Sequence, residues 1–150
     1  MKRHRSAALV TAVATAATLV ATAQPAQAAA AYYEHYGNAN CQGGYVCAWV
    51  WEDYTGYAIG FYNDAWDYAS IPSAYRYINN NSRSWEDHGL STYGNVRFFD
   101  AAGGSGRNKC LKKGYSVSRQ ADMNDLISAH VWTSTCSGYT LFAEQFVVWP

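Results

Sequence analysis

This sequence has no excess of positive charge. Its 11 Lys and Arg residues are matched by 11 Asp and Glu residues. Lys2, Arg3 and Arg5 lie at the very start, so 11 − 3 leaves 8 basic against 11 acidic residues after it, a net charge of about −3. Binding to nucleic acid depends on clustered cations that neutralise phosphates. The charge content therefore gives no support for a nucleic-acid partner.

The chain also has only one long apolar run, Ala7–Ala23, and this run lies close to its start. It follows the basic residues and precedes Ala26-Gln27-Ala28, a small-x-small pattern typical of a signal-peptidase site. The run is short for a membrane span. We therefore predict a secretory signal peptide over residues 1–28 and an extracellular mature protein without a membrane anchor. Residues 29–40 are then a lead-in to one domain over 41–150.

Long segments with a 3.6-residue apolar period are lacking as well, which argues against a mainly helical fold. Aromatic residues make up 16% of the chain, and all of them follow the predicted signal peptide. Bulky rings suit the pleated surface of a sheet, so the composition favours an all-β fold.

Catalytic signatures are lacking too. The histidines after the signal peptide, His35, His88 and His130, are widely spaced and form no His-Glu-x-x-His zinc motif. The segment Gly103–Arg107 departs from the Gly-x-Ser-x-Gly pattern at its last position. Adjacent acidic pairs such as Glu52-Asp53 point to opposite sides of a strand and make poor acid–base couples. We therefore predict that the protein is not an enzyme.

What the sequence does contain is a strand-and-turn unit around Trp49. The apolar run Tyr45–Trp51 ends at an acidic pair, and an aromatic and a glycine follow at Tyr54 and Gly56. Acidic residues compete for backbone hydrogen bonds and glycine accepts positive φ, so this pattern predicts a β-hairpin with Trp49 covering the bend. Because the strand is apolar on both faces, we expect it to be central in its sheet.

The same pattern returns 50 residues later, where Phe99 matches Trp49 and Gly106 matches Gly56. Each copy is followed by a second signature, Asn80-Asn81-Ser82-Arg83-Ser84 in the first and Asn124-Asp125-Leu126-Ile127-Ser128 in the second. Two patterns that recur in the same order indicate a duplicated unit. We place motif 1 at about 41–88 and motif 2 at about 95–136, with C-terminal strands to residue 150.

Four cysteines, Cys41, Cys47, Cys110 and Cys136, should be oxidised in an exported protein. Three pairings exist, and the sequence alone does not choose between them. Locality favours Cys41–Cys47 and Cys110–Cys136, with one bridge in each half. A zinc site is the rival interpretation, but the spacings are not those of paired zinc knuckles and export argues against it.

Each repeat contains two patterns in the same order. The first is aromatic-x4-aromatic-x-Gly, and the second is Asn/Asp-Asn/Asp-x-x-Ser/Thr. Together they resemble the Greek-key motif of the βγ-crystallins. The resemblance implies a βγ-crystallin-like Greek-key β-sandwich of two repeated motifs, since one four-stranded unit cannot bury its inner face alone. The context Cys41-x5-Cys47 before the aromatic strand looks more like the secreted actinobacterial peptidase inhibitors of family I36. Gly104 stands where the second aromatic is expected, so we expect that bend to lack its cover. Trp85 and Ala129 replace the last serine of the calcium-type signature.

The resemblance also implies calcium as a cofactor. The family site combines a backbone carbonyl and an Asn or Asp side chain from one turn with a hydroxyl from the other motif, and calcium prefers such oxygen ligands. One site would use Asn80, Asn81 and Ser128, and the other Asn124, Asp125 and Ser84. Only Asp125 is charged, so we expect weak binding, on the order of 10⁻⁴–10⁻³ M, with the Asp125 site the stronger. Alternatively, both turns are Asx turns that bond their own backbone.

For function, the resemblance implies a monomeric inhibitor that inserts a loop into an extracellular protease of the metalloproteinase class. Gly103–Lys113 is the candidate loop, because it has a glycine-rich tip and is tied at Cys110. The Cys110–Leu111 bond would present an apolar residue beside an anchored sulfur; alternatively, Leu111 belongs to the core. Two other functions stay open. One is a calcium-binding stability or stress module. The other is a toxin-like or cell-wall-glycan-binding protein with a stacking platform of Trp51, Tyr57, Trp66 and Trp85.

Overall fold

The computed structural model of the chain describes residues 31–38, 41–90 and 93–147. The predicted signal peptide lies outside the described residues. The strands are β1 (Tyr32–Tyr36), β2 (Val46–Trp49), β3 (Tyr57–Phe61), β4 (Ser84–Asp87), β5 (Asn95–Ala101), β6 (Ser105–Leu111), β7 (Tyr115–Val117), β8 (Ala129–Thr133) and β9 (Phe146–Val147). Two short 3₁₀ helices, η1 (Ser73–Ile78) and η2 (Ala102–Gly104), complete an all-β domain. In these described ranges no helix is long and apolar enough to span a membrane.

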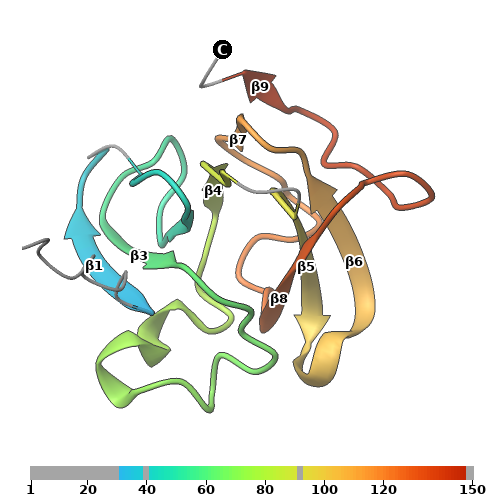
Figure 1. The fold of residues 1–150 in the computed structure, drawn as a ribbon. Coiled ribbons are helices and arrows are strands. Elements are labelled where there is room, and N and C mark those ends of the chain that lie inside the picture. The colour runs from blue at the N-terminus through green and yellow to red at the C-terminus, as the bar shows by residue number, and fades with distance from the viewer. Residues whose placement is uncertain (1–30, 39–40, 91–92, 148–150) are drawn as a thin grey trace, which may run out of the picture.

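The strands form two antiparallel sheets with a shared core between them (Figure 1). The first sheet has the order β1-β3-β2-β4-β7-β9, and the second has the order β6-β5-β8. Strand β7, from the second motif, pairs with β4 of the first motif. In return, Ala65 of the first motif forms an antiparallel bridge with His130 of β8. Each motif therefore contributes backbone to the sheet of the other, as a Greek-key sandwich of two units requires.

The first predicted hairpin is formed by β2 and β3. Asp53 and Tyr54 adopt positive φ angles of 56° and 58°, and Gly56 follows with a φ of 78°. The rings of Trp49 and Tyr54 meet edge to face at 5.5 Å. A Cβ at Gly56 would lie 2.0 Å from Cδ1 of Trp51, so only glycine fits this bend. The aromatic pair over the bend confirms the predicted role of Trp49.

Strand β2 is buried on both faces, as its apolar pattern predicts. Val46 and Ala48 face the main core between the sheets. Cys47 and Trp49 face a second cluster on the outer side of the first sheet, against which Tyr33 of β1 packs. Among the described strands, β1 pairs only with β3 at the end of the sheet order, so it is the edge strand that covers this cluster.

The second hairpin, between β5 and β6, is covered in a different way. A Cβ at Gly104 would lie only 2.6 Å from Cζ3 of Trp66, and the backbone N–H of Gly103 donates to the carbonyl of Trp66 at 2.6 Å. A ring from the first motif therefore covers the second bend and leaves no room for an aromatic residue at position 104. The expectation that this bend lacks a cover was wrong.

Both locally favoured disulfides are present, Cys41–Cys47 and Cys110–Cys136, with Cα separations of 5.8 and 5.6 Å.

The strands differ from expectation at two places in the second half of the chain. Strand β6 begins at Ser105, inside the segment expected to be a glycine-rich tip. Of the strands expected from Tyr139 onward, the structure describes only β9, because the backbone before it forms a loop that bonds to Cys110 instead.

Candidate functional site

The two Asn/Asp turns lie side by side and bond to each other reciprocally. The N–H of Asn80 donates to the carbonyl of Ile127 at 3.0 Å, and the N–H of Asp125 donates to the carbonyl of Ser82 at 3.0 Å. Asn80 and Asp125 are also the two turn residues with positive φ, at 52° and 55°. Asn80 is therefore equivalent to Asp125, one residue away from the register expected from sequence. In this corrected register, Arg83 occupies the position equivalent to Ser128.

Arg83 binds the carboxylate that was expected to bind calcium. Its Nε lies 3.0 Å from both oxygens of Asp125, and its Nη2 lies 2.7 Å from Oδ2. The guanidinium also lies over the ring of Trp51, 5.3 Å from its centroid. The hydrogen bonds that Arg83 donates to Asp125, and then the negative charge of Asp125, raise the pKa of Arg83. A permanent cation of the protein thus takes the place that a metal ion would need.

Ser84 does not approach Asp125 as a ligand. Its hydroxyl donates to the carbonyl of Trp51 at 2.7 Å and accepts from the N–H of Tyr54 at 3.0 Å, so it closes the first hairpin. The side chain of Asn124 instead donates to Glu52 at 3.3 Å. The predicted calcium set of Asn124, Asp125 and Ser84 therefore does not fit a metal ion, and this corrects the expectation that it would be the stronger site.

The other predicted calcium set, Asn80, Asn81 and Ser128, is assembled only in part. The hydroxyl of Ser128 donates to Oδ1 of Asn80 at 2.7 Å and lies 3.4 Å from the carbonyl oxygen of Asp100. Asn81 turns away, and its Nδ2 donates to the carbonyl of Tyr77 at 3.2 Å. These converging oxygens carry no formal charge and already satisfy each other, so they suit calcium only as a weak site. Within the described residues, no group of three or more His, Cys, Asp or Glu side chains could hold a metal ion.

The predicted inhibitory bond is not accessible. Cys110 and Leu111 end strand β6, and both have an exposed fraction of 0%. Leu111 pairs with Val96 of β5 and belongs to the main core. A protease cleft cannot reach either side chain while β6 is folded. This corrects the proposal that Cys110–Leu111 is the reactive bond, and the alternative that Leu111 is a core residue holds.

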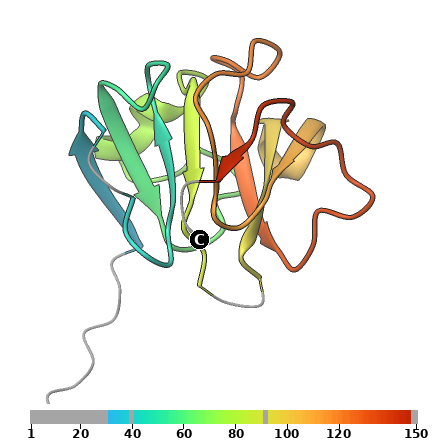
Figure 2. The same ribbon diagram turned by 90° about the horizontal axis from the view of Figure 1, so that it is seen from above.

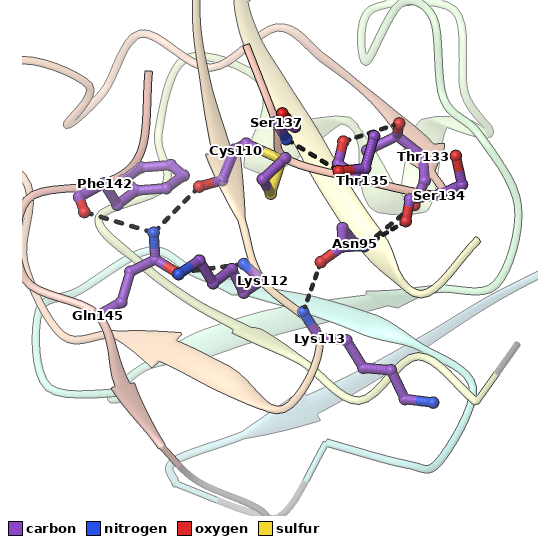
Figure 3. Close-up of a disulfide and its surroundings, with 11 residues drawn as sticks. Asn95, Cys110, Lys112, Lys113, Thr133, Ser134, Thr135, Ser137, Phe142 and Gln145 are labelled. Carbon is purple, nitrogen blue, oxygen red and sulfur yellow. Dashed lines mark hydrogen bonds between the residues drawn. A yellow bond between two sulfur atoms is a disulfide. The ribbon is translucent and has the colours of Figure 1, made fainter. Parts of the chain in front are cut away.

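A different segment beside the same disulfide is exposed. We call it the Cys136 loop: five consecutive exposed residues, Ser137–Leu141, between half-buried Cys136 and buried Phe142. In Figure 2 the chain between β8 and β9 projects from the side of the molecule farthest from β1. Figure 3 shows that the disulfide ties the start of this loop to Cys110 of β6.

The end of the Cys136 loop is tied to the same residue. The N–H of Cys110 donates to the carbonyl of Thr140 at 2.8 Å, and Leu141 forms a parallel bridge with Cys110. Nε2 of Gln145 donates to the carbonyls of Cys110 and Phe142 at 3.2 and 3.4 Å (Figure 3). Both ends of the loop are therefore fixed on one buried residue of β6.

Two apolar side chains of the Cys136 loop reach solvent. Tyr139 and Leu141 have exposed fractions of 36% and 38%. The guanidinium of Arg97 lies 3.8 Å from the ring centroid of Tyr139 and holds that ring in place. The exposed leucine beside the anchored sulfur is thus Leu141, not Leu111. Sequence alone misses this, because the pairing of β6 within its sheet decides that Leu111 is covered and Leu141 is not.

The aromatic residues expected to form one stacking platform are dispersed. Trp85 is fully buried in the main core. Trp51 lies under Arg83, whereas Trp66 covers the second hairpin. Tyr57 is partly buried and donates a hydrogen bond to the carbonyl of Ala74 at 3.0 Å.

One histidine is buried in the core, but both of its ring nitrogens are used for structure. Nε2 of His130 lies 3.1 Å from the carbonyl oxygen of Asn63, and Nδ1 lies 2.8 Å from the hydroxyl of Tyr68. Burial lowers the pKa of His130 to about 3. A neutral imidazole with both nitrogens bonded has no nitrogen left to act as a general base.

Comparison with known proteins identifies the fold. No family model and no curated protein matches the chain. Among solved structures, one described as "Evolution of the eye lens beta-gamma-crystallin domain fold" has a TM-score of 0.56 and 14% identity, covering 67% of this chain and 94% of that chain. A βγ-crystallin from Ciona intestinalis has a TM-score of 0.48 and 16% identity, covering 60% and 100% of the two chains. A βγ-crystallin from an archaeon has a TM-score of 0.46 and 16% identity, covering 61% of this chain and 99% of that chain. The first match, with the all-β topology, shows a βγ-crystallin-like Greek-key sandwich, and at this identity it shows the fold alone.

Proposed function

We propose that this βγ-crystallin-like domain is a secreted, non-catalytic inhibitor of an extracellular metalloproteinase and that the Cys136 loop is its recognition element. The observation that carries the proposal is the combination of exposure with anchoring at both ends. Each residue of Ser137–Leu141 is exposed, yet a disulfide and a backbone hydrogen bond both fix the loop to Cys110. The two disulfides also fit an oxidising compartment, as secretion requires.

Anchoring matters because a flexible loop loses conformational entropy when a protease binds it. Ordering costs about 0.5–1.5 kcal/mol for each immobilised side chain, so a loop that is already ordered retains more of its contact energy. The disulfide and the Thr140–Cys110 hydrogen bond also hold both ends in place if a bond between them is cut. The cleaved loop would therefore stay in the cleft rather than leave as two peptides.

The loop also offers suitable side chains. The resemblance to the inhibitor family implies a metalloproteinase target of the thermolysin type. Proteases of this type favour an apolar residue just after the cleaved bond. Leu141 is the exposed aliphatic residue of the loop, and Tyr139 supplies a second apolar surface that Arg97 holds in place. The basic residues Lys112 and Lys113 at the end of β6 stay in solvent and are not required by this proposal.

The test is a titration of the oxidised mature protein, residues 29–150, into a thermolysin-type protease kept in calcium and, separately, into a serine protease. We expect stoichiometric loss of metalloproteinase activity alone. Leu141→Ala should weaken inhibition at least tenfold. Leu126→Ala is the matched control, because Leu126 is 37% exposed but lies in an Asn/Asp turn. Equal inhibition by both variants, or no inhibition by the wild type, would exclude the Cys136 loop as the inhibitory element.

Calcium enters the proposal only as a weak ligand of the neutral set around Asn80 and Ser128. The support is the convergence of their side-chain oxygens with the carbonyl of Asp100. Thermal melting of the mature protein with calcium chloride and with EDTA tests this point. A difference that disappears in Ser128→Ala would support it, and identical melting curves would exclude it.

A further inference from the structure

A concave surface lies between the two motifs, and none of its lining residues belongs to the Cys136 loop. This groove has a volume of about 720 Å³, within the range of ligand sites. Its lining comes from the chain after β3 and from Trp132 of β8, with Gly44, Gly89, Leu90 and Tyr93. In Figure 1 the chain that follows β3 runs beside β8, as the Ala65–His130 bridge requires. We call it the Trp66 groove.

The lining of the Trp66 groove is rich in exposed aromatic rings. Tyr62, Trp66 and Tyr93 have exposed fractions of 45%, 53% and 62%, and Trp132 adds a fourth, partly buried ring. Trp85, by contrast, is fully buried in the main core. Aromatic rings gathered around a hollow and left in solvent are typical of a binding surface rather than of a core.

The groove is built on rigid backbone. Ala65 exchanges two hydrogen bonds with His130, at 3.0 and 2.8 Å, and His130 bonds the carbonyl of Asn63 at 3.1 Å. Trp66 is fixed by the 2.6 Å hydrogen bond from Gly103 to its carbonyl, and its ring lies against Gly104. One side of the Trp66 ring is therefore supported by the second hairpin, while about half of the side chain stays accessible.

The polar groups of the groove define the charge of the ligand. Asp64 is exposed, and its Oδ1 accepts the N–H of Trp132 at 2.8 Å. None of the described residues that line the groove is Lys or Arg. A carboxylate without a cation repels phosphate, sulfate and uronate groups but accepts hydrogen bonds from hydroxyl groups.

We propose that the Trp66 groove binds a neutral, β-linked polysaccharide. Sugars with equatorial hydroxyl groups have apolar C–H faces that stack on aromatic rings, and their hydroxyl groups can donate hydrogen bonds to the exposed carboxylate of Asp64. An open groove accepts a chain that continues in both directions. The site shares no residue with the Cys136 loop, so the polysaccharide would hold the domain on an insoluble surface without competing with loop binding.

The experiment measures retention of the oxidised mature protein on cellulose and on chitin, with alginate as the anionic polymer. We expect retention on a neutral polymer and not on alginate. Trp66→Ala should lower the affinity at least tenfold, and Tyr62→Ser should lower it to a smaller extent. Trp51→Ala is the matched control, because Trp51 is 52% exposed but lies outside the groove. Thermal melting of each variant verifies that it is folded.

Each outcome decides the proposal. Loss of binding in folded Trp66→Ala or Tyr62→Ser, with Trp51→Ala bound like the wild type, would support it. Equal loss in the Trp51 control, retention on alginate alone, or no retention on cellulose or chitin would overturn it. Because protease inhibition is measured in solution with a different variant, Leu141→Ala, either proposal can fail without affecting the other.

Discussion

Lowering the pH from 7 to 5 should destabilise the domain through His130, and the structure provides the magnitude. The carbonyl of Asn63 can only accept a hydrogen bond, so Nε2 of His130 carries the proton and Nδ1 accepts from the hydroxyl of Tyr68. The side chain is fully buried. A second proton would place a charge in the core and would break the bond that Tyr68 donates.

The sign follows from the two pKa values of His130. Burial lowers the pKa in the folded protein from 6.5 to about 3, so the unfolded chain takes up the proton first. Stability is then lost as the pH falls below 6.5 and continues to fall until the folded pKa is reached. At pH 5, which is 1.5 units below the unfolded pKa, the loss is about 2 kcal/mol. This figure hardly depends on the folded pKa, provided that it lies below 4.

The assay is urea unfolding of the oxidised mature protein at pH 7 and pH 5, for the wild type and for His130→Gln. Burial raises the pKa of Asp87 in the folded protein, so this group adds stability as the pH falls. Burial lowers the pKa of His35, which therefore acts in the same direction as His130. Both effects occur in the wild type and in the variant and cancel when the two are compared.

We expect the wild type to lose about 2 kcal/mol more than the variant between the two pH values. If both proteins lose the same amount, the buried imidazole is not the acid-sensitive group and the reasoning fails. Should His130→Gln not fold, an NMR titration of the wild type replaces it. A His130 ring signal that shifts near pH 6.5 in the folded protein would refute the argument equally well.

Three other predictions concern residues with defined contacts. Arg83→Ser should give the domain a calcium-dependent rise in Tm at least about 3 °C larger than that of the wild type, since it frees a carboxylate; an equal response to calcium and EDTA in both proteins would contradict this. Replacing Cys110 and Cys136 by alanine should lower the free energy of unfolding by about 3.5 kcal/mol, because the disulfide joins residues 26 positions apart and restricts the unfolded chain. A loss below about 1 kcal/mol in urea unfolding would show that the loop is held without the sulfurs. Gly60→Ala should cost about 1–3 kcal/mol in the same assay, because its Cβ would lie 2.0 Å from Cε1 of Tyr33; unchanged stability would show that β1 moves aside.

The features that the sequence predicts well are local. The hairpin after β2 depends on an apolar run, an acidic pair and Gly56, and each acts within a few residues of the bend. The disulfide pairing follows from the proximity of each cysteine to its partner along the chain. The interior position of β2, between β3 and β4, follows from a continuous apolar run that does not alternate with polar residues.

The features that the sequence does not predict depend on contacts between distant segments. Three asparagines follow one another at 79–81, and only the hydrogen bond to Ile127 selects Asn80 as the residue with positive φ. The pairing of Arg83 with Asp125 joins residues 42 positions apart and replaces the expected metal site. Leu111 is buried because it lies on β6 and packs into the main core, whereas Leu141 lies in an exposed loop.

The exchange of backbone between the two motifs has a consequence for the way the chain assembles. The pairing of β7 with β4 and the bridge between Ala65 and His130 cross the boundary at 89–94 in opposite directions. Neither half can complete its own sheet, so folding should be a single cooperative event, slowed by pairings between remote segments. Two fragments separated at this boundary should each stay unfolded when alone. Mixed together, they should associate into one noncovalent domain, because each fragment carries the strand that the other lacks.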